Sequence, residues 1–130
     1  MLGYAWLQNI IAAQSAPPNS VSTITLQHST AVGLIAHSGG GQADATKLTN
    51  VFNEISVAAA DGDSVALPNS QAGIAILVVN NSDHSVSVFP ATGEKMATVE
   101  DAAATVASGR AVLFTSLIAG DWVALAFASN

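Results

Sequence analysis

Beyond Val21 the chain consists of short runs in which apolar and polar residues alternate with a period of two. Gly, Asn, Asp and Pro separate these runs at short intervals. This pattern is typical of β-strands joined by tight turns and predicts an all-β fold, a single antiparallel β-sandwich or barrel-like domain. The predicted strands are Ser22–Leu26, Ala31–Ala36, Phe52–Val57, Ser64–Leu67, Gly73–Val79, Ser85–Phe89, Ala103–Val106, Arg110–Thr115 and Trp122–Phe127.

The segment Asp44–Asn53 fits two patterns. Its apolar residues, together with Ile55, have the spacing of a helix face, whereas Phe52–Val57 alternates as a strand does. We favour a strand from Val51 onward.

A hairpin is the clearest local prediction. Both faces of Ile74–Val79 are apolar, as in a central strand that is covered on both sides, whereas Ser85–Val88 has one polar face. Asn80–Asp83 supplies turn residues between the two runs. We therefore expect these two strands to pair with each other in antiparallel orientation.

The first residues follow a different pattern and form a short N-terminal helical or extended arm. Apolar residues recur there at helical spacing, and Pro17-Pro18 ends any helix. The members of this stripe are Leu2, Trp6, Leu7, Ile10, Ile11 and Ala13. The predicted organisation is thus an apolar arm and Pro linker over 1–20 and a β domain over 21–130. A helix this short is marginal alone, so its apolar face must lie on its own domain, on a sister subunit or on a different protein.

The arm, followed by Gln14-Ser15-Ala16, superficially resembles a signal peptide that ends in a small-x-small cleavage site, but we favour neither a signal peptide nor a membrane span. No Lys or Arg precedes Lys47, so the cationic start of a signal peptide is missing. The apolar run is also too short, and too interrupted by Gln8 and Asn9, to cross a bilayer. We expect no membrane partner.

Charge and composition narrow the possible functions. The 130 residues include three Lys or Arg and nine Asp or Glu, giving a net charge of −6. This balance excludes a protein that neutralises nucleic-acid phosphates with clustered cations. Only 9% of residues are charged and half are hydrophobic, with no Cys. A small domain of this composition must gain stability from packing, backbone pairing or association, and we expect a homo-oligomer.

The histidines and one acidic turn are the first candidates for chemistry. His28, His37 and His84 each lack a second ligand at metal-binding spacing on the same element. Asp61–Ser64 resembles a calcium loop only faintly, because the further oxygen ligands of an EF-hand are missing. The simpler interpretation is a β-turn in which Asp and Gly supply backbone freedom.

The remaining candidates are equally weak. Gly39–Gly41 opens no helix and lacks the Lys of a phosphate loop, and no G-x-S-x-G motif is present. Glu94, Glu100 and Asp101 form a small acidic group, which is most simply a solvated surface. The sequence therefore predicts no catalytic residue, no metal site and no cofactor.

Several short motifs follow one another between Asp61 and Leu125. They are G-D-S-V-A-L-P (Gly62–Pro68), Ala72-Gly73 before a strand ending V-V-N-N (Val78–Asn81), V-S-V-F-P-A-T-G-E (Val86–Glu94), V-A-S-G-R-A-V-L-F (Val106–Phe114) and G-D-W (Gly120–Trp122). In this order they resemble a pattern of virion proteins of tailed bacteriophages, over about half of the chain.

The resemblance implies a compact β domain displayed on a capsid or on fibres, commonly as a trimer and without enzymatic activity. Three parts of the chain depart from the pattern. Lys95–Val99 stands where such proteins often have an Asn-Gly turn, residues 21–57 match only loosely, and the arm lies outside the resemblance.

Composition and resemblance together favour a structural virion protein of the cement type on the outer surface of a phage capsid. It would form a trimer and bind across subunits of the major capsid protein. Aromatic and aliphatic side chains are the usual hot spots of interfaces, which makes residues of the arm the expected docking residues. They are Tyr4, Trp6, Leu7, Ile10 and Ile11.

Two other function classes are weighed against this one. A receptor- or glycan-binding module of a phage fibre or spike would need exposed aromatic residues to stack on sugars. Trp122 is the only tryptophan outside the arm, and its position beside Val123 and Leu125 indicates the core. A small enzyme is the least favoured, because the sequence contains no dense cluster of titratable residues.

Overall fold

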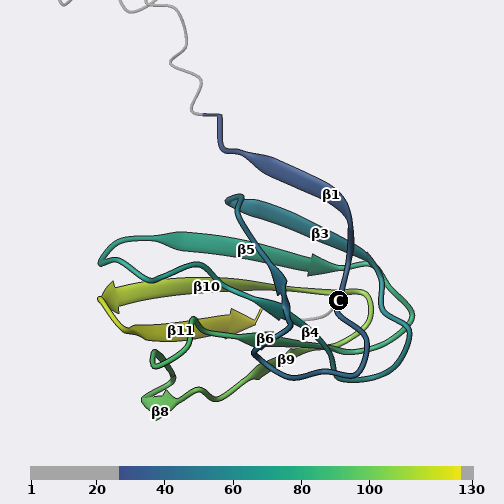
Figure 1. The fold of residues 1–130 in the computed structure, drawn as a ribbon. Helices are drawn as coiled ribbons and strands as arrows, with labels where there is room; N and C mark the ends of the chain where they lie inside the picture. Colours follow the sequence, from purple (N-terminus) through teal and green to yellow (C-terminus); the bar gives the residue numbers. More distant parts are fainter. Residues whose placement is uncertain (1–26, 127–130) are drawn as a thin grey trace, which may run out of the picture.

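The computed structural model describes residues 27–126, which form an all-β structure without a helix (Figure 1). Eleven strands lie in two sheets, one of seven strands and one of four. They are β1 (Thr30–Ile35), β2 (Thr46–Lys47), β3 (Phe52–Val57), β4 (Asp63–Ala66), β5 (Ala75–Asn80), β6 (Val86–Phe89), β7 (Lys95–Met96), β8 (Val99–Glu100), β9 (Ala104–Val106), β10 (Arg110–Ile118) and β11 (Asp121–Ala126). The predicted helix face of the arm and the predicted strand Ser22–Leu26 lie outside the described residues.

In its first half the chain passes repeatedly from one sheet to the other. β1, β3 and β5 are parallel neighbours in the larger sheet, and β2, β4 and β6 are parallel neighbours in the smaller one. Each passage through both sheets is one coil, and the coils stack so that Asp63 lies beside Val86, 23 positions later. This is the connectivity of a β-solenoid. The all-β prediction is confirmed, but the expected antiparallel sandwich or barrel is wrong, because stacked coils pair their strands in parallel.

The second half of the chain covers one end of the solenoid with antiparallel strands. β10 pairs with both β5 and β11, and β9 pairs with β6. β7 runs parallel to β11 and forms a small hairpin with β8. Within residues 27–126, β1 and β2 therefore remain the edge strands at the opposite end. Figure 1 shows β1 at the upper edge of the larger sheet, beside β3.

The hydrophobic core lies between the two sheets and follows from the alternation of the strands. Every second residue of β5, β6 and β10 is buried, so each of these strands has one inward face. Phe114 and Trp122 are the largest side chains without exposed surface, and the predicted core position of Trp122 is confirmed. Burying such a side chain stabilises the fold by about 1.5–3 kcal/mol.

The predicted hairpin between Ile74–Val79 and Ser85–Val88 is wrong, because β5 and β6 lie in different sheets. The side chain of Asn80 explains the path of the chain. Its amide nitrogen donates to the carbonyl oxygens of His84 (2.8 Å) and Val106 (2.9 Å), and its oxygen accepts from Ser82 N (3.0 Å) and Ser82 Oγ (2.6 Å). These bonds hold an arc that carries the chain across to the smaller sheet instead of reversing it.

The turn between β7 and β8 departs from ordinary backbone preference. Ala97 and Thr98 have φ angles of 51° and 71°, so both central residues are left-handed. A two-residue hairpin loop needs this geometry, which Asn-Gly adopts easily and a β-branched residue rarely does. Ala97 N donates to Trp122 O (2.8 Å) and Thr98 N to Asp121 Oδ1 (3.1 Å), and these contacts hold the turn in place.

Replacing this pair by Asn-Gly is expected to stabilise the protein. The double variant Ala97→Asn/Thr98→Gly keeps both N–H donors and removes the strain of two left-handed residues, so the free energy of unfolding should rise by about 1–2 kcal/mol. Urea denaturation measures this as a higher midpoint at an unchanged slope.

The matched control is Ala91→Asn/Thr92→Gly, the same change at an Ala-Thr pair whose φ angles are not positive. It should leave stability unchanged or lower it. An equal rise in both variants would contradict the explanation by backbone strain.

Candidate functional site

The predicted docking residues of the arm lie outside the part of the chain that the structure describes. Tyr4, Trp6, Leu7, Ile10 and Ile11 all fall within residues 1–26. Their docking role therefore stays a prediction, and the candidate surfaces below are built from residues 27–126.

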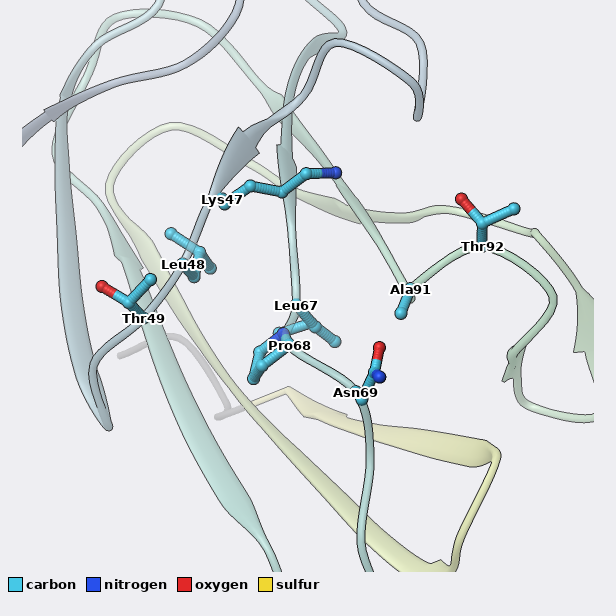
Figure 2. Close-up of a pocket in the computed structure, with 8 residues that line it drawn as sticks. All are labelled: Lys47, Leu48, Thr49, Leu67, Pro68, Asn69, Ala91 and Thr92. Carbon is cyan, nitrogen blue, oxygen red and sulfur yellow. The ribbon is translucent and has the colours of Figure 1, made fainter.

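A groove of about 450 Å³ crosses the turns that follow β2, β4 and β6. Figure 2 shows Leu67 and Pro68 between the segments Lys47–Thr49 and Ala91–Thr92, so three successive coils contribute to it. Backbone bonds from Leu48 N to Ala66 O and from Leu67 N to Phe89 O keep these turns stacked, each at 2.8 Å. The similar runs Leu48-Thr49-Asn50 and Leu67-Pro68-Asn69 were the signal in the sequence that could have revealed this stacking.

The lining of the groove combines buried apolar side chains with exposed polar groups. Leu48 and Leu67 are buried beneath it, and Lys47, Thr49, Asn69 and Thr92 present an amine, an amide and two hydroxyls at its surface. Lys47 is the titratable residue of this lining, and the other polar groups are an amide and hydroxyls, which orient a ligand through hydrogen bonds.

The three histidines lie apart and take part in local packing. The rings of His28 and Phe52 meet edge to face with centroids 5.3 Å apart, and the backbone of His37 forms a bridge with Ser64. His84 Nδ1 lies 3.6 Å from Asp61 Oδ1 on the surface. Across residues 27–126, no group of three His, Asp or Glu side chains is placed to hold a metal ion.

Asp63 builds the turn that precedes β4. Its carboxylate accepts hydrogen bonds from the backbone N–H groups of Gly39 (3.1 Å), Ala59 (2.7 Å) and Ala60 (3.2 Å). Burial raises the pKa of Asp63, but these bonds outweigh burial, and the pKa lies below its ordinary value. The predicted turn is confirmed for Asp61 and Gly62, with Gly62 at a φ of 88°, whereas Asp63 and Ser64 already belong to β4.

The acidic group predicted as a solvated surface is partly structural, so that prediction is wrong for Glu94 and Asp101. The Glu94 carboxylate accepts hydrogen bonds from Ser70 N (2.9 Å) and from the indole nitrogen of Trp122 (3.0 Å). Asp101 accepts from Gln42 Nε2 (2.9 Å) and Gly93 N (2.8 Å). Glu94 thereby connects the P-A-T-G-E motif to the G-D-W motif, a contact that no local pattern could show.

Nine large apolar side chains of the described residues are exposed. Val32, Leu117 and Ile118 are more than 70% exposed, and they lie on β1 and β10. The others with substantial exposure are Ile35, Phe52, Val57, Val99, Val123 and Leu125. Exposed apolar side chains mark an interaction surface where they adjoin in a contiguous patch, as those on neighbouring strands can.

No protein-family model, no curated protein and no solved structure matches the chain. In the described part of the chain, no helix has the length and apolar character needed to cross a membrane.

Glu94→Gln is expected to lower the free energy of unfolding by about 1–3 kcal/mol. Ser70 N donates to both carboxylate oxygens of Glu94 (2.9 and 3.1 Å), and the Trp122 indole donates to Oε2 (3.0 Å). Gln keeps one oxygen and places an N–H donor where the other stood, so Ser70 N faces a donor in place of one acceptor and both bonds lose their charge assistance. Chemical denaturation at neutral pH measures the loss. Glu100→Gln, at an exposed position on β8, is the matched control and should change stability by less than about 0.5 kcal/mol. Equal effects of the two variants would contradict a structural role of Glu94.

Acid is expected to destabilise the fold. The pKa values of Glu54, Asp61, Asp63 and Asp101 all lie below their ordinary values, mainly because each carboxylate accepts hydrogen bonds. The unfolded chain then binds protons before the folded one, so this stabilisation is complete above about pH 4–5 and is lost as pH falls through the folded pKa values. The melting temperature should fall steadily from about pH 4 downward.

Two variants test whether hydrogen-bonded carboxylates cause the loss of stability in acid. Asp63→Asn should lower the melting temperature at pH 7 and reduce the difference between pH 7 and pH 2.5. Asp44→Asn, at an exposed position, should leave the melting temperature at pH 7 unchanged. A melting temperature of the parent protein that stays constant down to pH 2.5 would refute the prediction.

Proposed function

We propose that this chain is a structural virion protein that decorates and stabilises a phage capsid by binding across major capsid protein subunits. The observation that carries the proposal is the exposure of large apolar side chains on a small, weakly charged β-solenoid. Protein surfaces of this kind are stable in water mainly when association covers them.

The arrangement of the polar groups supports a structural role rather than an enzymatic one. Carboxylates that could act as acids or bases, such as those of Glu94 and Asp63, accept hydrogen bonds from backbone or indole N–H groups. These hydrogen bonds stabilise the turn before β4 and the contact between the P-A-T-G-E and G-D-W motifs. We therefore include no catalytic residue, metal or cofactor in the proposal.

Docking through the arm and trimer formation complete the proposal. Tyr4, Trp6, Leu7, Ile10 and Ile11 would bind the capsid, and three copies would associate through their β domains on the outer surface of the capsid. Linked copies bind by avidity, so a weak contact for each arm suffices for stable occupancy. The motifs between Gly62 and Trp122 that resemble those of tailed-phage virion proteins support this assignment.

A receptor- or glycan-binding module of a fibre or spike is the second candidate, favoured by the groove of about 450 Å³. Its amine, amide and hydroxyl groups could orient a polar ligand. Trp122 is buried and therefore offers no stacking surface for a sugar ring. Binding of a glycan or host receptor that is lost in Asn69→Ala would favour this candidate over capsid decoration.

Removing the arm is expected to abolish capsid occupancy. The experiment adds the purified chain to capsids assembled from the major capsid protein encoded in the same genome, and quantifies the bound chain by mass spectrometry. Trp6→Ala should weaken binding about 30-fold, which corresponds to about 2 kcal/mol for an anchor residue. Asp44→Ala, at an exposed polar position of the β domain, is the control and should bind as the parent does. Unchanged occupancy after deletion of Met1–Pro17 would remove the arm from the mechanism.

A further inference from the structure

The outer face of the larger sheet carries apolar side chains on four neighbouring strands, β3, β5, β10 and β11. Phe52, Leu77, Leu113 and Leu125 lie side by side in register on β3, β5, β10 and β11. They alternate with the buried residues Asn53, Ile76, Val78, Val112, Phe114 and Trp122, so they point away from the core. A sheet face that meets water ordinarily carries polar residues at these positions.

This outer face has almost no charge in its middle. Glu54 is the ionisable residue of β3, and its carboxylate accepts hydrogen bonds from Gly33 N (3.0 Å), Ser56 Oγ (2.9 Å) and Asn81 Nδ2 (3.2 Å). The other charged residues of the four strands, Arg110 and Asp121, stand at strand ends. A covering segment would thus displace water mainly from apolar groups.

A small hollow lies at the β1 side of the same face. It has a volume of about 110 Å³ and is lined by residues of β1, β3 and β5, among them Val32, Phe52 and Val79. An apolar cavity of roughly 150 Å³ holds a benzene-sized group, so this hollow has the size for one apolar side chain.

The N-terminal arm is the segment of this chain that fits the face. As a helix, residues 1–13 would be about 20 Å long, and four adjacent strands span roughly 15–20 Å. The connection Gln14–Ser29 leads directly into β1, which pairs with β3 at the edge of the face. Fully extended it reaches about 50 Å, which is enough to place the arm on any part of the face.

Charge favours the arm over a second copy as the occupant. All nine Asp and Glu residues come at or after Asp44, and no Lys or Arg precedes Lys47, so the first 43 residues contain no charged side chain. A second copy on this face would add its own net charge of −6, whereas the arm adds no charge, so the arm is the occupant that adds no electrostatic repulsion at this face. Trimer formation through another surface of the β domain would have to overcome the same repulsion. A helix on one face of a sheet is also a standard packing arrangement.

We infer that, in the free protein, Met1–Ala13 packs across the outer face of β3, β5, β10 and β11, with one of its apolar side chains in the hollow beside Phe52. This inference goes beyond the proposed function and stands whether or not a capsid is the partner. If both hold, the face and the capsid compete for the same arm, and the free protein keeps its docking residues covered until it binds.

Thiol reactivity tests this inference, because the chain contains no Cys. Val123→Cys places one thiol on the outer face, and Val99→Cys places one on β8, on the opposite side of the sheet. The parent residues are 39% and 58% exposed, so similar rates are expected if nothing covers the face. Each rate of maleimide modification of the full chain is divided by the rate for the same variant in denaturant, which removes differences in intrinsic reactivity.

We expect Val123→Cys to react at least tenfold more slowly than Val99→Cys. Adding Trp6→Ser and Ile10→Ser should accelerate modification at position 123 at least fivefold and leave position 99 unchanged. Similar rates at both positions, or no effect of the arm substitutions, would overturn the inference. Protection that grows with protein concentration, together with a mass in multiples of 13.1 kDa by light scattering, would assign the face to a second copy and also overturn it.

The outcome is separable from that of the proposed function. Loss of capsid occupancy in Trp6→Ala with an unprotected thiol at position 123 would leave capsid docking intact and refute the covered face. Protection at position 123, together with unchanged capsid occupancy in Trp6→Ala, would support the covered face and refute docking through the arm.

Discussion

The arcs that carry the chain between its two sheets are the constraint on which the rest of the structure depends. Each arc leaves backbone N–H and carbonyl groups that no strand neighbour satisfies, and buried groups of this kind need partners. Asp63 and Asn80 provide them from single side chains. Because the arcs are held in this way, successive strands enter opposite sheets, and parallel stacking of the coils follows.

The same stacking determines the character of the surface. A strand in a stacked coil has one face toward the core and one toward the outside, and the outer positions of β3, β5, β10 and β11 are largely apolar. Few charged side chains accompany them, and a contiguous apolar face of this kind is commonly covered by another segment or protein. We propose two binding sites for the same apolar arm: the outer face of the larger sheet in the free protein, and the capsid after docking.

The candidate surfaces were less visible in the sequence than the strands were. Local alternation identified most strands and placed Trp122 in the core, but it missed the two-residue strands β2, β7 and β8, which are too short to show a period. The groove depends on the stacking of turns from three coils, and Glu94 meets Trp122 across 28 positions. Such contacts depend on the path of the chain, so the acidic group resembled an ordinary solvated loop.

The sequence by itself determined the all-β character, the positions of most strands and the core position of Trp122, because a period of two is a property of neighbouring residues. The sequence did not determine which strands are hydrogen-bonded neighbours in a sheet. Val79 and Val86 were as compatible with a hairpin as with two separate sheets, since both arrangements bury the same apolar residues. Only the tertiary structure decided between them, because the partners that hold the arcs, Gly39 for Asp63 and Val106 for Asn80, are 24 and 26 positions away along the chain.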